Sequence, residues 1–151
     1  MEKTRYRGTK DEVRALNAYV KLLRASESVS ARIHGHLAEA RLTASQFGVM
    51  EALYHLGPLS QGELAKKILR SSGNITMVID NLEDRGLVKR ERNQKDRRFY
   101  AVRLTVEGRR LIGSVFPRHA AKIVEEMKSL TRTEQEELSR LCRKVGLRDD
   151  K

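Results

Sequence analysis

The chain of 151 residues lacks several features that would assign it to other classes of protein. It has one cysteine, Cys142, so it forms neither an intrachain disulfide nor a metal site built from several cysteines. It has no run of about 18 or more apolar residues, the length that a membrane-spanning helix needs. Residues 1–7 lack the apolar core of a secretory signal peptide. We therefore expect a cytoplasmic protein that does not enter a membrane.

The short signatures of catalysis and cofactor binding are also missing. The sequence contains no nucleophile elbow, phosphate-binding Walker loop, dinucleotide fingerprint or zinc-protease motif. Its four histidines include no i, i+4 pair of the kind that binds a metal from one helix face. We therefore expect no enzyme, no bound cofactor and no metal site.

What the chain does have is positive charge, with a formal net charge of +11. Seven basic and two acidic side chains fall within residues 85–98. The basic ones are Arg85, Lys89, Arg90, Arg92, Lys95, Arg97 and Arg98. A local cationic patch favours a polyanionic partner, because binding releases counterions from that partner. A solvated basic loop is the alternative interpretation.

Apolar residues recur at helical spacing through the first half of the chain. This spacing predicts a long helix from Asp11 to about Gly35. Capping boxes at Thr43–Gln46 and Ser60–Glu63 predict the starts of a second and a third helix. Ser71 or Ser72 can cap a fourth helix.

The fourth helix carries Ile75, Val78, Ile79 and Leu82 at i, i+3, i+4 and i+7, which predicts one buried face. Gly86 lies just beyond it, where a left-handed residue would end the helix. The third and fourth helices are short and closely spaced, which is typical of a helix-turn-helix.

Two short strands are predicted after the fourth helix, from Leu87 to Arg92 and from Phe99 to Leu104. In the second strand we expect Tyr100, Val102 and Leu104 to point inward. The polar residues 93–98 would join the strands as a hairpin. A hairpin directly after a helix-turn-helix makes a winged helix.

Helical spacing returns after the hairpin. Pro117 should kink or divide the next helix, and a capping box at Thr131–Glu134 predicts the start of the last one. Cys142 falls on the apolar face of that last helix, so we expect a buried, inert thiol. The predicted fold is mainly α with a small β-hairpin. A winged helix-turn-helix domain would occupy residues 41–109, and residues 1–40 and 110–151 would form a discontinuous helical dimerisation module.

Several motifs within this arrangement resemble the MarR family of bacterial transcriptional regulators. They are Leu64-Ala65, Ser71-Ser72-Gly73-Asn74-Ile75-Thr76, Asn81-Leu82-Glu83, Arg85-Gly86-Leu87-Val88, Asp96-Arg97-Arg98, Leu104-Thr105 and Gly108. The resemblance implies a homodimer that binds a pseudo-palindromic operator in double-stranded DNA, usually as a repressor. It also implies a pocket for a small phenolic or other aromatic effector.

The fourth helix supplies the first group of candidate DNA-binding residues. Its N-terminal half is uncharged, and the helix dipole makes that end positive. We expect this end to enter the major groove, where polar side chains meet base edges or phosphates and a methionine contacts a thymine methyl. The candidates are Ser71, Ser72, Asn74, Thr76 and Met77. In the alternative interpretation, the serines only cap the helix and Asn74 is solvated.

The wing supplies the second group. One of Arg97 and Arg98 can enter a minor groove while Asp96 holds its neighbour through a charge-assisted hydrogen bond. The family resemblance assigns the inserted arginine to Arg98 and the supporting carboxylate to Asp96. Lys95 and Arg97 then become phosphate contacts. A plain turn residue is the alternative interpretation of Asp96.

A third group of residues could bind an effector. His34, His36, Phe47, Met50 and Tyr54 could together form an aromatic pocket with a protonatable partner for a phenolate or carboxylate. Ordinary core and interface positions are the alternative. For the whole chain, a winged helix that binds protein or RNA is the rival hypothesis. RNA binding would require stacking aromatics, and Phe99 is the only aromatic expected near the wing surface.

Overall fold

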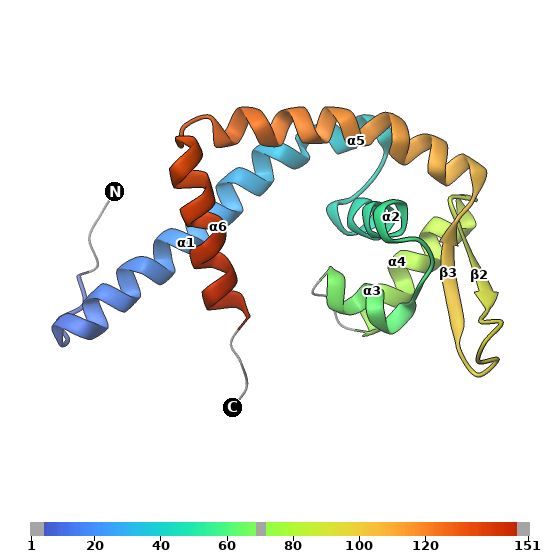
Figure 1. Cartoon of the computed structure of the whole chain (residues 1–151), viewed down its shortest axis with the longest axis horizontal. Helices are drawn as coiled ribbons and strands as arrows, with labels where there is room; N and C mark the ends of the chain where they lie inside the picture. The colour runs from blue at the N-terminus through green and yellow to red at the C-terminus, as the bar shows by residue number, and fades with distance from the viewer. Residues whose placement is uncertain (1–4, 69–71, 148–151) are drawn as a thin grey trace. The chain divides into compact units, whose positions relative to one another are not determined.

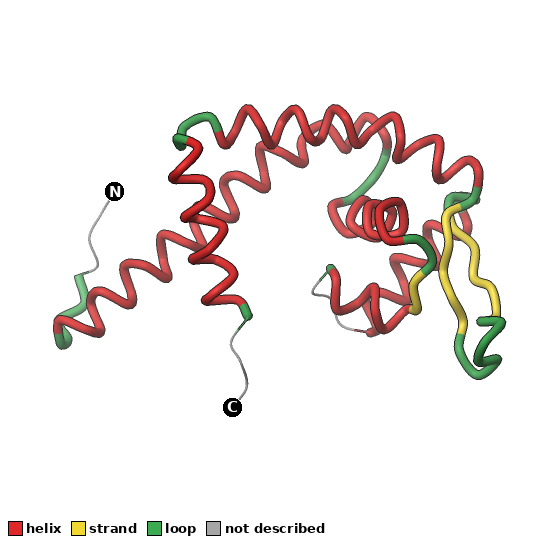
Figure 2. The backbone as a smooth tube through the Cα atoms, in the orientation of Figure 1, coloured by secondary structure: helices red, strands yellow, loops and turns green. Residues whose placement is uncertain are grey.

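The computed structural model describes residues 5–68 and 72–147. They form a mainly helical chain with one small antiparallel sheet, as predicted (Figures 1 and 2). The elements are α1 (Lys10–His34), the 3₁₀ helix η1 (Gly35–Ala40), α2 (Ala44–Leu56), β1 (Leu59–Ser60), α3 (Gln61–Lys67), α4 (Ser72–Asp84), β2 (Val88–Arg92), β3 (Tyr100–Leu104), α5 (Val106–Met127) and α6 (Arg132–Gly146). Within the described ranges, no helix is both long enough and apolar enough to cross a membrane.

The chain divides into two compact units. The central unit comprises residues 34–119, from η1 through most of α5. The terminal unit comprises the described residues up to Ile33 and from Ala120 onward.

The helices of the central unit begin where the sequence predicts. The Thr43 hydroxyl accepts a hydrogen bond from the backbone N–H of Gln46, whose side chain accepts one from the backbone N–H of Thr43. Ser60 and Glu63 form the same reciprocal pair at the start of α3. Gly86 has a φ of +71° and ends α4 in the left-handed region, as predicted. These local signals confirm the predicted order of helices.

The core of the central unit joins α2, α3, α4 and the start of α5 to the sheet. Its largest fully buried side chains include Phe47, Met50, Leu53, Leu64, Ile75, Ile79, Leu82, Val88, Val102 and Ile112. They come from α2, α3, α4, β2, β3 and α5, so one apolar cluster holds the hairpin of β2 and β3 against α4.

The sheet has three strands in the order β1-β3-β2. The hairpin of β2 and β3 is confirmed, with Arg90 opposite Val102 and Arg92 opposite Tyr100. The sequence does not predict β1, because two residues carry no alternating pattern and pair with β3 through backbone groups. The predicted inward orientation of Tyr100 is wrong, since the residue is 51% exposed and pairs with Arg92 next to the hairpin loop.

The motif Leu104-Thr105 with Gly108 closes the wing. The Thr105 hydroxyl donates to the carbonyl of Gly86 at 2.6 Å, and it accepts from the Gly108 N–H at 3.0 Å. A Cβ atom on Gly108 would overlap the carbonyl oxygen of Leu87, so α5 approaches the start of the wing this closely only with glycine here.

The structure corrects two predictions for the later helices. Of the predicted kink or division at Pro117, the division is wrong, because α5 is a single helix from Val106 to Met127. Proline removes only one backbone donor, and the surrounding turns carry the helix past it. Cys142 is exposed rather than buried, because the apolar face that it shares with Leu138 and Leu141 is itself exposed in the single chain.

Candidate nucleic-acid interface

Helix α4 has one stripe of residues that packs into the core and another that is exposed to solvent. Each residue advances about 100° around a helix, so positions i, i+3 or i+4, and i+7 share a face. Ile75, Ile79 and Leu82 form the fully buried stripe. Asn74, Met77 and Asn81 form a stripe, here called the exposed stripe, whose three members are all exposed. The structure therefore leaves one polar face of α4 open to a partner.

Two of the predicted helix contacts, Asn74 and Met77, lie on the exposed stripe, where Met77 is 63% exposed. Asn81 joins them and is absent from the sequence-based candidates, although its spacing of seven residues from Asn74 was a signal for it. Ser71 lies outside the described residues, and Ser72 is the first residue of α4.

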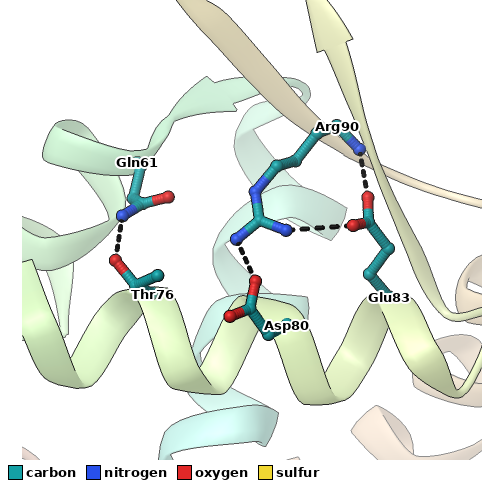
Figure 3. A network of polar contacts seen from close by, with 5 residues as sticks. All are labelled: Gln61, Thr76, Asp80, Glu83 and Arg90. Carbon is teal, nitrogen blue, oxygen red and sulfur yellow. Dashed lines mark hydrogen bonds and ion pairs between the residues drawn. The ribbon is translucent and has the colours of Figure 1, made fainter.

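A third stripe of α4, here called the bracketed stripe, consists of Thr76, Asp80 and Glu83. The Thr76 hydroxyl accepts a hydrogen bond from Gln61 Nε2 at the start of α3 (Figure 3). Thr76, the remaining predicted helix contact, is only half-buried and is held by α3 on this side. It therefore occupies a different face of the helix from Asn74 and Met77.

The other two residues of the bracketed stripe bind Arg90 of β2. Arg90 Nη2 lies 2.6 Å from Asp80 Oδ1, and Nη1 lies 3.0 Å from Glu83 Oε1 (Figure 3). The backbone N–H of Arg90 also donates to Glu83 Oε2 at 3.0 Å. The Arg90 side chain is 23% exposed, so this cation of the sequence patch is engaged inside the unit.

The other cations of the patch have unequal surroundings. The Arg85 guanidinium donates to the carbonyls of Arg41 and Ala40, at 2.6 and 3.3 Å. Arg92 lies against Tyr100, with its guanidinium carbon 5.6 Å from the ring centre. Lys89 Nζ lies 3.9 Å from Glu91. The patch of seven therefore divides into cations that support the fold and cations at the hairpin tip.

The hairpin tip is organised by Asn93 and Asp96. Asn93 Oδ1 accepts from the backbone N–H groups of Lys95 and Asp96, at 2.9 and 3.3 Å. The backbone N–H of Asn93 donates to the carbonyl of Phe99 at 2.8 Å, which closes the turn. The loop therefore holds its shape through its own polar groups.

Asp96 and Arg98 form a bidentate pair at this tip. Arg98 Nε and Nη2 lie 3.0 and 2.9 Å from the two carboxylate oxygens of Asp96. Hydrogen bonds from the Arg98 side chain, and then from its backbone N–H, lower the pKa of Asp96. The Arg98 side chain is 83% exposed, so the pair projects into solvent.

Lys95 precedes Asp96 and Arg97 lies between the two paired residues in sequence, and both Lys95 and Arg97 are exposed. Among the described residues, neither side chain has an ion pair or a hydrogen bond. The tip thus presents one arginine oriented by Asp96 and two exposed cations, Lys95 and Arg97.

The predicted effector residues lie in the same unit and divide between two neighbouring groups of rings and the core. His34, His36 and Phe47 gather around His119, with ring centres 6.1, 5.4 and 4.4 Å from it. Tyr54 lies in a neighbouring group with His55 and Phe116. Met50 is fully buried in the core.

Sequence reasoning missed His119 as the centre of this ring cluster, because more than 70 positions separate it from Phe47 in the chain. His119 is 5% exposed, and its Nδ1 has no hydrogen-bond partner among the described residues. Burial, followed by the charges of His36 and His34, lowers the pKa of His119. Burial raises the pKa of the nearby Glu51 carboxyl, and His55 and His34 partly oppose that rise.

Helices α3 and α4 followed by a hairpin with an oriented arginine define a winged helix-turn-helix protein that binds DNA. The comparisons with known proteins agree. The model of the MarR family matches residues 42–99. The HTH-type transcriptional regulator MhqR of Bacillus subtilis (strain 168) is 34% identical over 134 residues, which cover 89% of this chain and 92% of MhqR.

Solved structures show the same relationship. BpsR of Bordetella bronchiseptica, whose DNA binding is regulated by 6-hydroxynicotinic acid, is 28% identical with a TM-score of 0.77, over 85% of this chain and 91% of that chain. Apo MarR of E. coli is 26% identical with a TM-score of 0.69, over 82% of this chain and 93% of that chain. The chain belongs to the MarR family of transcriptional regulators, and the resemblance seen in the sequence is confirmed.

Proposed function

We propose that this regulator is a cytoplasmic repressor, without enzymatic activity, that binds a pseudo-palindromic operator as a homodimer. Residues 41–109 would bind DNA, and residues 1–40 and 110–151 would form the dimerisation module. The observation that carries the proposal is the presence, in one unit, of the exposed stripe of α4 and the Asp96–Arg98 pair at the wing tip. One element suits a major groove and the other a minor groove.

The DNA contacts would divide between the two elements. Asn74 and Met77 would face base edges in the major groove, with Ser71 and Ser72 near the phosphates at the helix start. Thr76, which accepts a hydrogen bond from Gln61 on another face of α4, would support the helix instead of reading bases. Arg98 would enter the adjacent minor groove, held in orientation by Asp96. Lys95 and Arg97 would bind phosphates on either side of that groove.

Dimerisation would use the apolar residues that the terminal unit leaves exposed. In α1 they include Leu16, Tyr19, Val20 and Leu23, and in α6 they include Leu138, Leu141 and Val145. Monomeric soluble proteins rarely expose contiguous apolar faces of this extent. A second copy of the chain is the partner that the family membership favours.

An aromatic or phenolic effector would act on the ring cluster of the central unit. His36 is buried in that cluster, and with Glu39 and Arg118 it also lines a hollow of about 340 Å³. The Arg118–Glu39 pair, at 2.9 Å, would supply a cation for a phenolate or carboxylate. In this proposal His34, His36, Phe47, Met50 and Tyr54 remain the effector-binding group. Binding of the effector would change the spacing of the two recognition helices in the dimer, and operator affinity would fall.

Selection of DNA fragments by the purified protein tests the proposal. Sequencing of the retained fragments should yield one enriched motif with two inverted half-sites, whose centres lie about one helical turn, or a multiple of it, apart. A pool that shows no enrichment, or a single half-site without an inverted copy, would contradict the proposal of a dimeric operator reader.

A further inference from the structure

The ion pairs of Arg90 connect two elements that must reach different grooves of the same duplex. Arg90 is the middle residue of β2, so it moves with the hairpin that carries Arg98. Its partners Asp80 and Glu83 lie on α4, one turn apart. The guanidinium and backbone N–H of one residue therefore link the wing strand to the recognition helix at three points.

The partners of Arg90 also have the wrong charge for DNA. Asp80 and Glu83 are 54% and 40% exposed in their side chains, so without a cation they would place two negative charges beside a polyanion. Arg90 binds both carboxylates at once through two different nitrogens of its planar guanidinium, a fixed geometry that an ammonium with one nitrogen does not have. The ion pairs of Arg90 thus reduce the repulsion between these two carboxylates and DNA, and they also fix the position of β2 relative to α4.

We propose that Arg90 is a positioning residue for DNA recognition: by binding Asp80 and Glu83 it sets the wing relative to the exposed stripe of α4, and it does not itself contact phosphate. Gln61 acts on the same stripe from the other side, through Thr76 (Figure 3). The bracketed stripe is therefore an anchor between α3 and the wing, while the neighbouring stripe reads DNA. This inference rests on the proposed function, because it assigns roles within that DNA-binding surface.

Substitution of Arg90 by lysine separates this role from a phosphate contact. Lysine keeps the charge but donates from a single nitrogen, so it cannot reproduce the geometry in which two guanidinium nitrogens each bind one carboxylate. If Arg90 contacted phosphate, Arg90→Lys would bind a selected operator duplex nearly as well as the unaltered protein. As a positioning residue, Arg90→Lys should lose about tenfold or more in operator affinity, while its affinity for a scrambled duplex should change less than threefold, because phosphate contacts alone hold that complex. Lys89→Gln is the matched control, since it removes a more exposed cation from the adjacent position of the same strand.

A double-mutant cycle with Arg98 separates positioning from a general loss of stability. In the unaltered protein, Arg98→Ala should weaken operator binding about tenfold or more. In the Arg90→Gln background the wing is already misplaced, so the same change should cost less than about threefold. Thermal unfolding of each variant would show that the molecules compared are folded.

The results also distinguish this inference from the function on which it rests. Arg90→Lys with unaltered operator affinity, or additive effects of Arg90→Gln and Arg98→Ala, would overturn the positioning role and leave the proposed function intact. Equal affinity of the unaltered protein for the operator and scrambled duplexes would overturn both.

Discussion

Arg98 at the tip of the wing donates to both carboxylate oxygens of Asp96, from Nε at 3.0 Å and from Nη2 at 2.9 Å. The backbone N–H of Arg98 donates to the same carboxylate at 3.1 Å. A bidentate pair fixes the plane of the guanidinium, and here it does so on a side chain that is 83% exposed. The arginine is thus oriented before DNA arrives, so less conformational freedom is lost on binding.

Arg98→Ala should weaken operator binding by about 1–3 kcal/mol, because it removes the group that we assign to the minor groove. Asp96→Asn should cost less, since the arginine stays but loses its orientation. Titration of a labelled operator duplex at fixed salt measures both effects. An Arg98→Ala variant with the affinity of the unaltered protein would rule out the wing assignment.

Lys95→Ala should behave differently, because a phosphate contact carries no sequence information. We expect a similar loss of affinity for the operator and for a scrambled duplex, and a decrease of about one unit in the slope of log affinity against log salt. A salt series with both duplexes gives the slope. If Lys95→Ala weakened operator binding alone and left the slope unchanged, Lys95 would be a base reader instead.

His119 should make the stability of the chain depend on pH. Its pKa lies below the ordinary value of 6.5, because it is buried and faces His36 and His34. As the pH falls below 6.5, His119 therefore becomes protonated in the unfolded chain before it does in the folded chain. The free energy of unfolding should then fall as the pH drops. Glu51, which interacts with His34, and the Arg118–Glu39 pair are the other charged groups nearby.

Chemical denaturation between pH 7.5 and 5, at constant chain concentration, measures this dependence. His119→Gln should reduce the fall in stability, whereas His55→Gln, at an exposed position, should change it much less. Curves for His119→Gln that keep the full pH dependence would show that another group causes it.

Leu141→Glu should dissociate the proposed dimer, because it places a charge on the exposed apolar face of α6, where Leu141 is 44% exposed. We expect a monomer by sedimentation and a loss of more than about tenfold in operator affinity, since both half-sites must be bound together. Ser139→Glu adds the same charge off that face and should remain dimeric. A dimeric Leu141→Glu variant would exclude the α6 face from the interface.

Local signals in the sequence predicted the local structure well. The capping boxes at Thr43 and Ser60, the left-handed Gly86 and the alternation of Val102 and Leu104 each depend on nearby residues, and the structure has all of them. Such features are readable because their physical cause lies within a few positions of the chain.

Features that depend on contacts between residues far apart in the chain, or on a helix face that has no partner in the single chain, could not be predicted. A count of charges does not reveal that Arg90 and Arg85 are engaged inside the unit. Spacing along the chain does not bring His119 to Phe47. An apolar helix face looks the same in sequence whether it enters a core or awaits another chain, which is why Cys142 was expected to be buried and is exposed.

The central claim is that α4 and the wing together read a DNA sequence. The most direct test is a titration of the unaltered protein against a selected operator duplex and a scrambled duplex of the same composition, at near-physiological salt. We predict a preference for the operator of about 1,000-fold or more. Equal affinity for the two duplexes would contradict the account, because it would show that the protein binds the phosphate backbone without reading the bases.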